Sequence, residues 1–134
     1  MISGWYTGGA RVALRGRVFP VICAALLIAC GKHEPPPPVV AGGDGTLGKH
    51  LLAQYQCGTC HEIPEVAAAR GNTGPSLVLF GRRSYIAGHI PNYPEPLIRW
   101  IVNPQAMVPE TLMPSMGVSA DDARHMAAYL YTLR

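Results

Sequence analysis

Two cysteines and a histidine stand within five residues, in the run Cys57-Gly58-Thr59-Cys60-His61. Two thiols at this spacing on one helical turn can each form a thioether with a vinyl group of haem, which holds His61 beneath the iron. Its imidazole can then serve as the proximal ligand, while its other ring nitrogen donates a hydrogen bond that fixes the tautomer. The run therefore predicts one haem c, attached through Cys57 and Cys60, with His61 as an iron ligand.

Other uses of a Cys-x-x-Cys pair compete with this interpretation. A zinc site needs two more ligands at similar spacing, and a redox dithiol of the thioredoxin kind belongs in a βαβ pattern. Neither context is visible in the sequence. A protein without haem, in which Cys57 and Cys60 form a disulfide, stays open as an alternative.

The positive net charge of the chain comes from its first residues. The 11 Lys and Arg residues exceed the 8 Asp and Glu residues by three, and three arginines, Arg11, Arg15 and Arg17, precede an apolar run. From Cys30 onward the formal charges balance, so a basic surface that binds nucleic acid has no support.

The N-terminal third is typical of an export signal followed by a tether. The apolar run Val18 to Ala29 is about twelve residues long, whereas a membrane-spanning helix needs about twenty. It ends in Leu27-Ile28-Ala29-Cys30, which resembles the lipobox of bacterial lipoproteins and implies cleavage before Cys30 and its lipidation. An ordinary signal peptide and an uncleaved anchor are the alternatives.

The composition divides the chain into three parts. We expect a signal peptide over residues 1–29, a Pro/Gly-rich tether over 30–45 that starts at lipidated Cys30, and a domain over 46–134. Four consecutive prolines, Pro35 to Pro38, predict an extended spacer of about 3.1 Å per residue, and the glycines after them predict a hinge.

The sequence of the domain predicts helices and no strands. Leu47, Leu51, Leu52 and Tyr55 share one helical face, with Asp44 or Thr46 as the cap, and Gly48 suggests close approach of the C-terminal helix. A middle helix is expected over about Pro96 to Val102. The last helix begins at Ser119 and carries an apolar stripe, and no convincing strand pattern appears, so the predicted class is all-α. The stripe residues are Ala123, Met126, Ala127, Leu130 and Leu133.

A six-coordinate iron would need a second ligand, and spacing alone does not choose it. Met126 falls in the buried stripe and His125 beside it, so packing explains both. Met113 lies in a proline-punctuated loop where it has no core to fill. The candidates are His89, His125, Met107, Met113, Met116 and Met126.

Residues 45–134 resemble class I cytochrome c in several motifs besides the cysteines. The run Thr73 to Leu77 is similar to the family's loop in which a proline carbonyl, here that of Pro75, accepts a hydrogen bond from the proximal histidine. Asn103-Pro104 followed by Met113 resembles the segment that leads to the axial methionine. Ala128-Tyr129-Leu130 resembles the end of the family's C-terminal helix. The resemblance implies the cytochrome c fold, with helices wrapped around haem.

The resemblance also implies roles for three further side chains. Trp100 would lie near the methionine sulfur, and Arg82 or Arg83 would meet a haem propionate. The stretch Leu77 to Gly81 is shorter than in the best-known mitochondrial members, so the choice between the arginines stays open. The lysine ring by which those members dock is missing, and Met116 remains a rival to Met113.

His61 and Met113 together would leave the iron no open position, which predicts a one-electron carrier rather than an enzyme. Methionine ligation and an apolar pocket predict a fairly high reduction potential. The segments Arg83 to Gly88 and Pro91-Asn92 also resemble cytochrome domains associated with terminal oxidases. We therefore expect a lipid-anchored carrier on the periplasmic side of a bacterial membrane that serves a redox complex such as an oxidase. The alternative is a gas-binding sensor whose methionine dissociates. The expected pocket residues are Leu77, Leu79, Phe80, Trp100 and Ile101.

Overall fold

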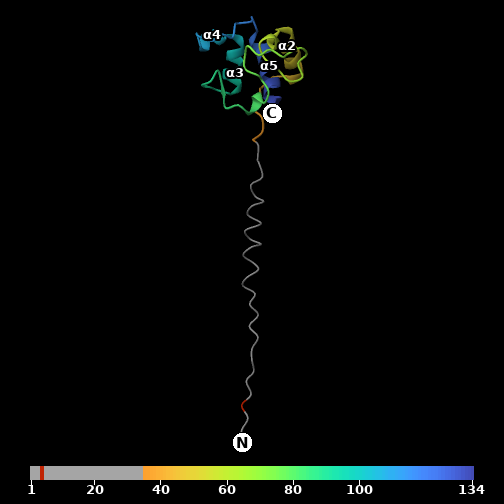
Figure 1. The fold of residues 1–134 in the computed structure, drawn as a ribbon, viewed down its shortest axis with the longest axis vertical. Coiled ribbons are helices and arrows are strands. Elements are labelled where there is room, and N and C mark those ends of the chain that lie inside the picture. Colours follow the sequence, from red (N-terminus) through yellow and green to blue (C-terminus); the bar gives the residue numbers. More distant parts are fainter. Residues whose placement is uncertain (1–3, 5–34) are drawn as a thin grey trace. The chain divides into compact units, whose positions relative to one another are not determined.

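The domain consists of helices joined by long, hydrogen-bonded loops (Figure 1). The computed structural model describes Gly4 and residues 35–134, so the predicted signal segment and Cys30 lie outside the described residues. This part of the chain contains four α-helices, two 3-10 turns and one two-stranded sheet, which confirms the predicted all-α class. In order they are α2 (Gly45–Gln54), η1 (Cys57–Thr59), η2 (Phe80–Arg82), β1 (Tyr85–Ile86), β2 (Ile90–Pro91), α3 (Pro94–Val102), α4 (Pro104–Met107) and α5 (Ala120–Thr132).

Helices α2 and α5 start at capped ends and pack against each other. The Asp44 side chain accepts hydrogen bonds from the amides of Thr46 and Leu47, and the Ser119 hydroxyl accepts one from the Asp122 amide. The helices meet at Gly48, where an added Cβ would lie 1.9 Å from the carbonyl oxygen of His125. The close approach predicted at Gly48 is therefore confirmed.

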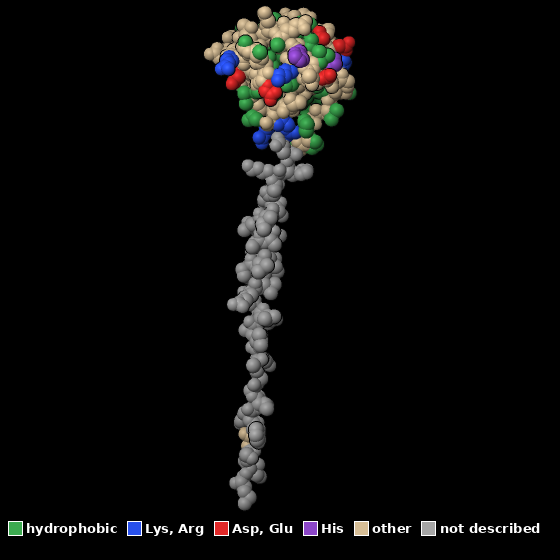
Figure 2. Space-filling model, turned by 90° about the vertical axis from the view of Figure 1, so that its right-hand side faces the viewer, with side chains coloured by type: hydrophobic (Ala, Val, Ile, Leu, Met, Phe, Trp, Pro, Cys, Tyr) green, Lys and Arg blue, Asp and Glu red, His purple; other side chains and the backbone are tan. Residues whose placement is uncertain are grey.

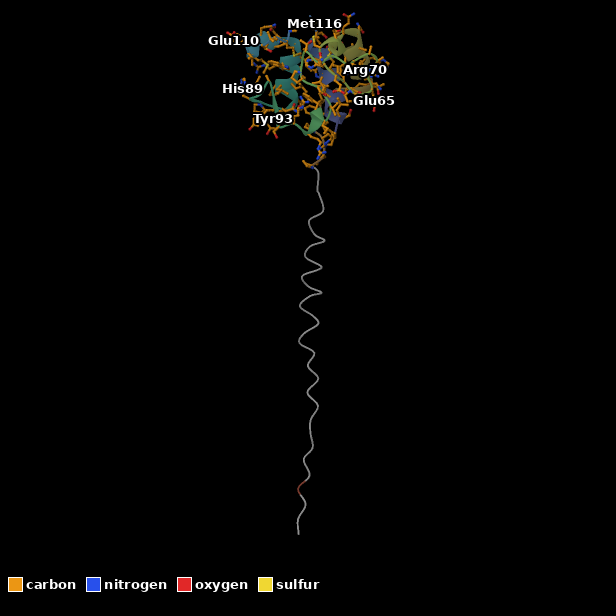
Figure 3. The ribbon with its side chains drawn as sticks, viewed as in Figure 1. Glu65, Arg70, His89, Tyr93, Glu110 and Met116 are labelled. Carbon is orange, nitrogen blue, oxygen red and sulfur yellow. The ribbon has the colours of Figure 1, made fainter. Side chains whose placement is uncertain are left out.

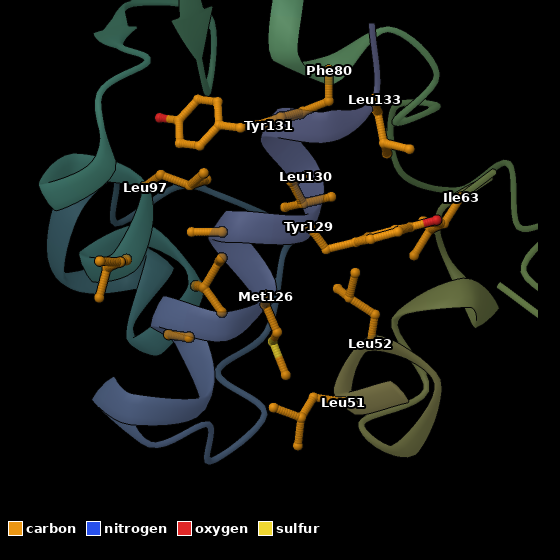
Figure 4. Close-up of a cluster of buried hydrophobic side chains, with 14 of the residues drawn as sticks. Leu51, Leu52, Ile63, Phe80, Leu97, Met126, Tyr129, Leu130, Tyr131 and Leu133 are labelled. Carbon is orange, nitrogen blue, oxygen red and sulfur yellow. The ribbon is translucent and has the colours of Figure 1, made fainter. Parts of the chain in front are cut away.

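The apolar stripe of α5 forms the centre of the core (Figure 4). Ala123, Met126 and Ala127 have no exposed surface. Helix α2 contributes two leucines to this core, but Leu47, which we had placed on the same face, is 42% exposed. The other contributors include Leu51, Leu52, Ile63, Phe80, Leu97, Ile98, Ile101, Leu130 and Leu133.

The middle of the chain differs from the sequence prediction at the start of α3 and in the residues that follow its end. The helix begins at Pro94 rather than at about Pro96, because Tyr93 is extended and Pro94 fits the first helical position. It ends at Val102 as predicted, but a second short helix, α4, follows at once. Helix α4 can start there because Asn103 caps it: the Asn103 side chain accepts a hydrogen bond of 3.2 Å from the amide of Ala106.

A small antiparallel hairpin precedes α3. Tyr85 pairs with Pro91 and Ile86 with Ile90, although the sequence showed no strand pattern. Strands of two residues are too short to display the alternation by which strands are recognised. The turn between them contains Gly88, whose φ of +81° is a conformation that favours glycine.

The folded body begins before residue 46. Val40, which we had assigned to the tether, is 8% exposed and belongs to the core. Gly43 packs so closely that an added Cβ would lie 2.8 Å from Cβ of Ala128, and the Asp44 amide donates a 2.9 Å hydrogen bond to Nδ1 of His125. These contacts attach residues 40–44 to α5. Of the helices in the described part, none has the length and apolar character to cross a membrane.

Candidate haem site

The loop after the Cys-x-x-Cys-His run folds back along it. The amide of Gly71 donates to the carbonyl of Gly58 at 3.0 Å, and the amide of Gly74 donates to that of Cys60 at 2.8 Å. A third bond, of 2.8 Å, joins the amide of Leu77 to the carbonyl of Glu62. These three hydrogen bonds hold residues 71–77 beside the motif and place Gly74 and Pro75 next to the His61 ring.

The imidazole of His61 is held from two sides. Its Nδ1 lies 2.7 Å from the carbonyl oxygen of Pro75. A carbonyl can only accept, so Nδ1 carries the hydrogen and Nε2 keeps the lone pair that a metal requires. The ring also packs against Gly74, where an added Cβ would lie 2.5 Å from Cε1. The hydrogen bond that the resemblance implied is present in this arrangement.

The two cysteines lie on or beside the 3-10 turn η1, with His61 directly after them. The amides of Cys60 and His61 both donate to the Cys57 carbonyl, at 3.3 and 3.0 Å. Both thiols are unpaired among the described residues. Burial raises the pKa of the Cys57 thiol, whereas a reactive dithiol needs a lowered pKa. The described residues contain no cluster of three His, Cys, Asp or Glu side chains that could hold a zinc ion.

The backbone of Met113 is hydrogen-bonded in both directions. Its amide donates to the Thr111 hydroxyl at 3.3 Å, and its carbonyl accepts a 2.9 Å bond from the Gln105 side chain on α4. Met116 lies next to Gly117, whose φ is +71°, and is 46% exposed; Figure 3 shows it at the edge of the domain. Helix α4, which the sequence did not reveal, thus positions the methionine segment.

The two candidate arginines differ in their surroundings. Arg83 is half-buried; its guanidinium carbon lies 5.6 Å from the centre of the Phe80 ring. Its Nη2 donates to the carbonyl of Ser76 and, at 3.4 Å, to that of Val78. Arg82 is exposed. Trp100 is half-buried on α3 and packs against the core.

Apolar side chains lie exposed on both segments that flank the proposed ligands. Val78 and Leu79 follow Pro75, and Leu112 precedes Met113; Leu112 is 94% exposed. Leu79 had been expected in a dry pocket, yet it is exposed in the protein alone, whereas Phe80 and Ile101 are buried. Uncovered apolar surface beside unpaired thiols and a prepared imidazole fits a large, mostly apolar group. These residues therefore fit haem.

The roles of several residues that shape the site were not predicted from the sequence. Gly74 supports the His61 ring, and Gln105 and Thr111 hold the Met113 backbone. Only Gly74 carried a signal, because a glycine before a proline next to a ligand suggests close approach. A glutamine and a threonine are too common for their pattern to indicate a role.

A helical domain with a Cys-x-x-Cys-His turn and a carbonyl-oriented histidine defines a protein that carries covalently bound haem. The family model described as Cytochrome c matches residues 46–134, and the chain belongs to this family. Its cofactor is therefore haem c attached at Cys57 and Cys60, and its general activity is electron transfer. The expected family, fold class and cofactor are confirmed.

The chain is also similar to an oxidase subunit. It is 32% identical over 88 residues to the cytochrome c oxidase subunit 2 of Alkalihalophilus pseudofirmus, and the match covers 65% of this chain. It covers 25% of that protein, so the chain spans about a quarter of its relative's length.

Proposed function

We propose that this protein is a mono-haem electron carrier, tied to a bacterial membrane by lipid on Cys30, which exchanges electrons with a respiratory complex such as a terminal oxidase. His61 and Met113 are its axial iron ligands. The observation that carries the proposal is the 2.7 Å contact between His61 Nδ1 and the Pro75 carbonyl, because it leaves Nε2 as the ligand atom.

The surroundings of the two methionines favour Met113 as the second ligand. A ligand that stays bound through many redox cycles needs a backbone held in one position. Hydrogen bonds at both its amide and its carbonyl hold the backbone of Met113 in this way. Met116 is more exposed and adjoins a glycine with positive φ. Two permanent ligands leave no coordination position for a substrate, which favours a carrier over an enzyme.

The chain's own residues do three things in electron transfer. Cys57 and Cys60 anchor the cofactor, His61 and Met113 hold the metal in one coordination state, and the core around Phe80, with its buried side chains, excludes water. Haem supplies the iron that accepts and returns one electron. No side chain is required as an acid or base.

The membrane and partner assignments rest on the sequence and on the relative. The lipobox-like run that ends at Cys30 supports the lipid anchor, and the export signal supports the periplasmic side. The likeness to an oxidase subunit supports an oxidase as partner. The charged groups do not indicate nucleic acid, because acidic and basic side chains are interspersed on the face shown in Figure 2.

Carbon monoxide binding distinguishes the carrier from a gas sensor. We expect the reduced wild-type protein at neutral pH to bind carbon monoxide slowly and incompletely, because both axial positions are filled. Met113→Ala serves as the positive control, since it opens one position and should bind the gas rapidly. Rapid, complete binding by the wild-type protein would refute the carrier and support the sensor.

Fractionation of cells tests the anchor. Cys30→Ser should release the protein into the soluble fraction and abolish incorporation of labelled fatty acid. Cys23→Ser, within the apolar run, is the matched control and should stay with the membrane. Retention of Cys30→Ser in the membrane would indicate an uncleaved helix instead. Purification of the native lipidated protein should bring an oxidase with it, and a different redox complex in the same preparation would replace that partner.

A further inference from the structure

Asn92 stands out because its buried amide forms hydrogen bonds with three different residues. It is 7% exposed and is the single buried polar or charged side chain in the described part of the chain. Its Nδ2 donates to the carbonyl of Arg83 at 3.0 Å and to that of Phe80 at 3.4 Å, and its Oδ1 accepts a 3.1 Å bond from the Tyr131 hydroxyl. The backbone amide of Asn92 also donates a hydrogen bond, of 3.0 Å, to the carbonyl of Ser84.

Tyr131 connects this amide to the C-terminal helix. Its ring is buried, with its centre 6.2 Å from that of Phe80, and its hydroxyl points away from α5 towards the hairpin side (Figure 4). Burial raises the pKa of Tyr131 to about 12, so the hydroxyl remains a donor at neutral pH. The amide of Gly81 donates to the Leu133 carbonyl at 2.9 Å. Segment 80–84 is thus attached to α5 directly and through Asn92.

Segment 80–84 carries Arg83, whose side chain reaches the loop that orients His61. The guanidinium donates to the carbonyls of Ser76, which directly follows Pro75, and of Val78, two residues further along. The position of the Arg83 charge therefore depends on two sets of hydrogen bonds. One set is made by its own side chain, and the other is made with its segment by Asn92, which in turn accepts a bond from Tyr131. A buried polar network that satisfies all its members gives up little stability and specifies one arrangement.

We propose that Asn92 and Tyr131 are positioning residues that hold the Arg83 guanidinium beside the haem and thereby raise the reduction potential. This inference rests on the proposed function. A nearby positive charge favours the reduced iron, which carries one positive charge fewer than the oxidised iron. Loss of the Tyr131 hydroxyl lets segment 80–84 move, so the Arg83 charge spends more time in solvent, where its effect on the iron is weaker.

The test compares two hydroxyl deletions on the same helix. Tyr131→Phe removes the bond to Asn92, whereas Tyr129→Phe removes a bond of 2.6 Å to the carbonyl of Pro64. The two side chains leave α5 in opposite directions (Figure 4). Figure 3 shows Tyr93 and Glu65, the neighbours of Asn92 and Pro64, on opposite sides of the domain. The pair therefore separates an effect on Arg83 from the general effect of losing a hydroxyl.

The readouts are the midpoint potential of the holoprotein, from a spectroelectrochemical titration, and hydrogen exchange of the amides in 80–84. We expect Tyr131→Phe to reduce the equilibrium constant for reduction at least about twofold, which is about 18 mV at 59 mV per tenfold for one electron. Exchange at Gly81 should become faster. Tyr129→Phe should change neither readout.

A double mutant shows whether the effect passes through Arg83. Arg83→Gln should lower the potential by more than Tyr131→Phe does, and adding Tyr131→Phe to it should cause no further change. Asn92→Ala removes all the side-chain bonds at that position and should lower the potential at least as much as Tyr131→Phe.

The outcomes distinguish this inference from the proposed function. An unchanged or raised potential in Tyr131→Phe, an equal shift in Tyr129→Phe, or an additive shift in the double mutant overturns the positioning role. A wild-type protein that shows no reversible one-electron couple refutes the carrier itself.

Discussion

Replacing Gly48 by alanine tests the packing of α2 on α5, which supports the haem motif at the end of α2. The added Cβ would lie 1.9 Å from the carbonyl oxygen of His125, 2.5 Å from its carbonyl carbon and 2.9 Å from the amide nitrogen of Met126. All three are backbone atoms in the interior of α5, so no side-chain rotation can relieve the overlap. The helices must move apart.

The size of the effect follows from two opposing terms. Overpacking a core position costs about 1 to 3 kcal/mol, and we take the upper end because only backbone can yield. Alanine in a helix gains about 1 kcal/mol over glycine. We expect Gly48→Ala to lower the free energy of unfolding by about 2 kcal/mol, or to lower the Tm by about 8 to 16 °C in a domain of this size.

Gly45→Ala on the same helix is the matched control. An added Cβ at Gly45 would lie 3.6 Å from Tyr129 Cα, which is ordinary contact, so its stability should equal or slightly exceed that of the wild type. The assay is guanidinium unfolding of the holoproteins, followed by far-ultraviolet circular dichroism. If Gly48→Ala proves as stable as Gly45→Ala, the helices do not meet at Gly48 in solution and the reasoning is wrong.

Three further predictions concern the haem site and Tyr131. Gly74→Ala should displace the His61 ring, because its Cβ would lie 2.5 Å from Cε1, and altered haem absorption together with a shifted potential should reveal this; unaltered spectra would contradict the packing. Met113→Ala should abolish the sulfur-to-iron absorption band and lower the potential, whereas Met116→Ala should retain both; the reverse result would transfer the ligand role to Met116. The Tyr131 phenol releases its proton near pH 10 when unfolded and near 12 when folded, so stability should fall between these values. The free energy of unfolding, measured with urea from pH 9 to 12, should therefore fall less steeply with pH in Tyr131→Phe than in the wild type. The same pH dependence in both proteins would contradict the assigned burial of Tyr131.

Local patterns predicted the parts of the site that lie close together in the chain. The cofactor followed from five residues. Single polar side chains before apolar runs predicted the cap at Ser119 and narrowed the other cap to Asp44 or Thr46, of which the structure has Asp44. The prediction was wrong where tertiary contacts decide. Val40 belongs to the core although it follows four prolines, because the neighbouring residues Gly43 and Asp44 attach this segment to α5.

The sequence by itself determined the cofactor, its two attachment points and the histidine beside them, because this chemistry depends on the spacing of adjacent residues. It also predicted α2, α5 and the contact between them at Gly48, through periodicity and the absence of a side chain, but not the short helix α4. Only the tertiary structure decided the surroundings of Arg82 and Arg83, which the sequence left equivalent. Hydrogen bonds to Ser76 and Val78, and from Asn92 to its carbonyl, distinguish Arg83. These partners are up to nine residues away and meet it only through the fold, so no local pattern encodes them.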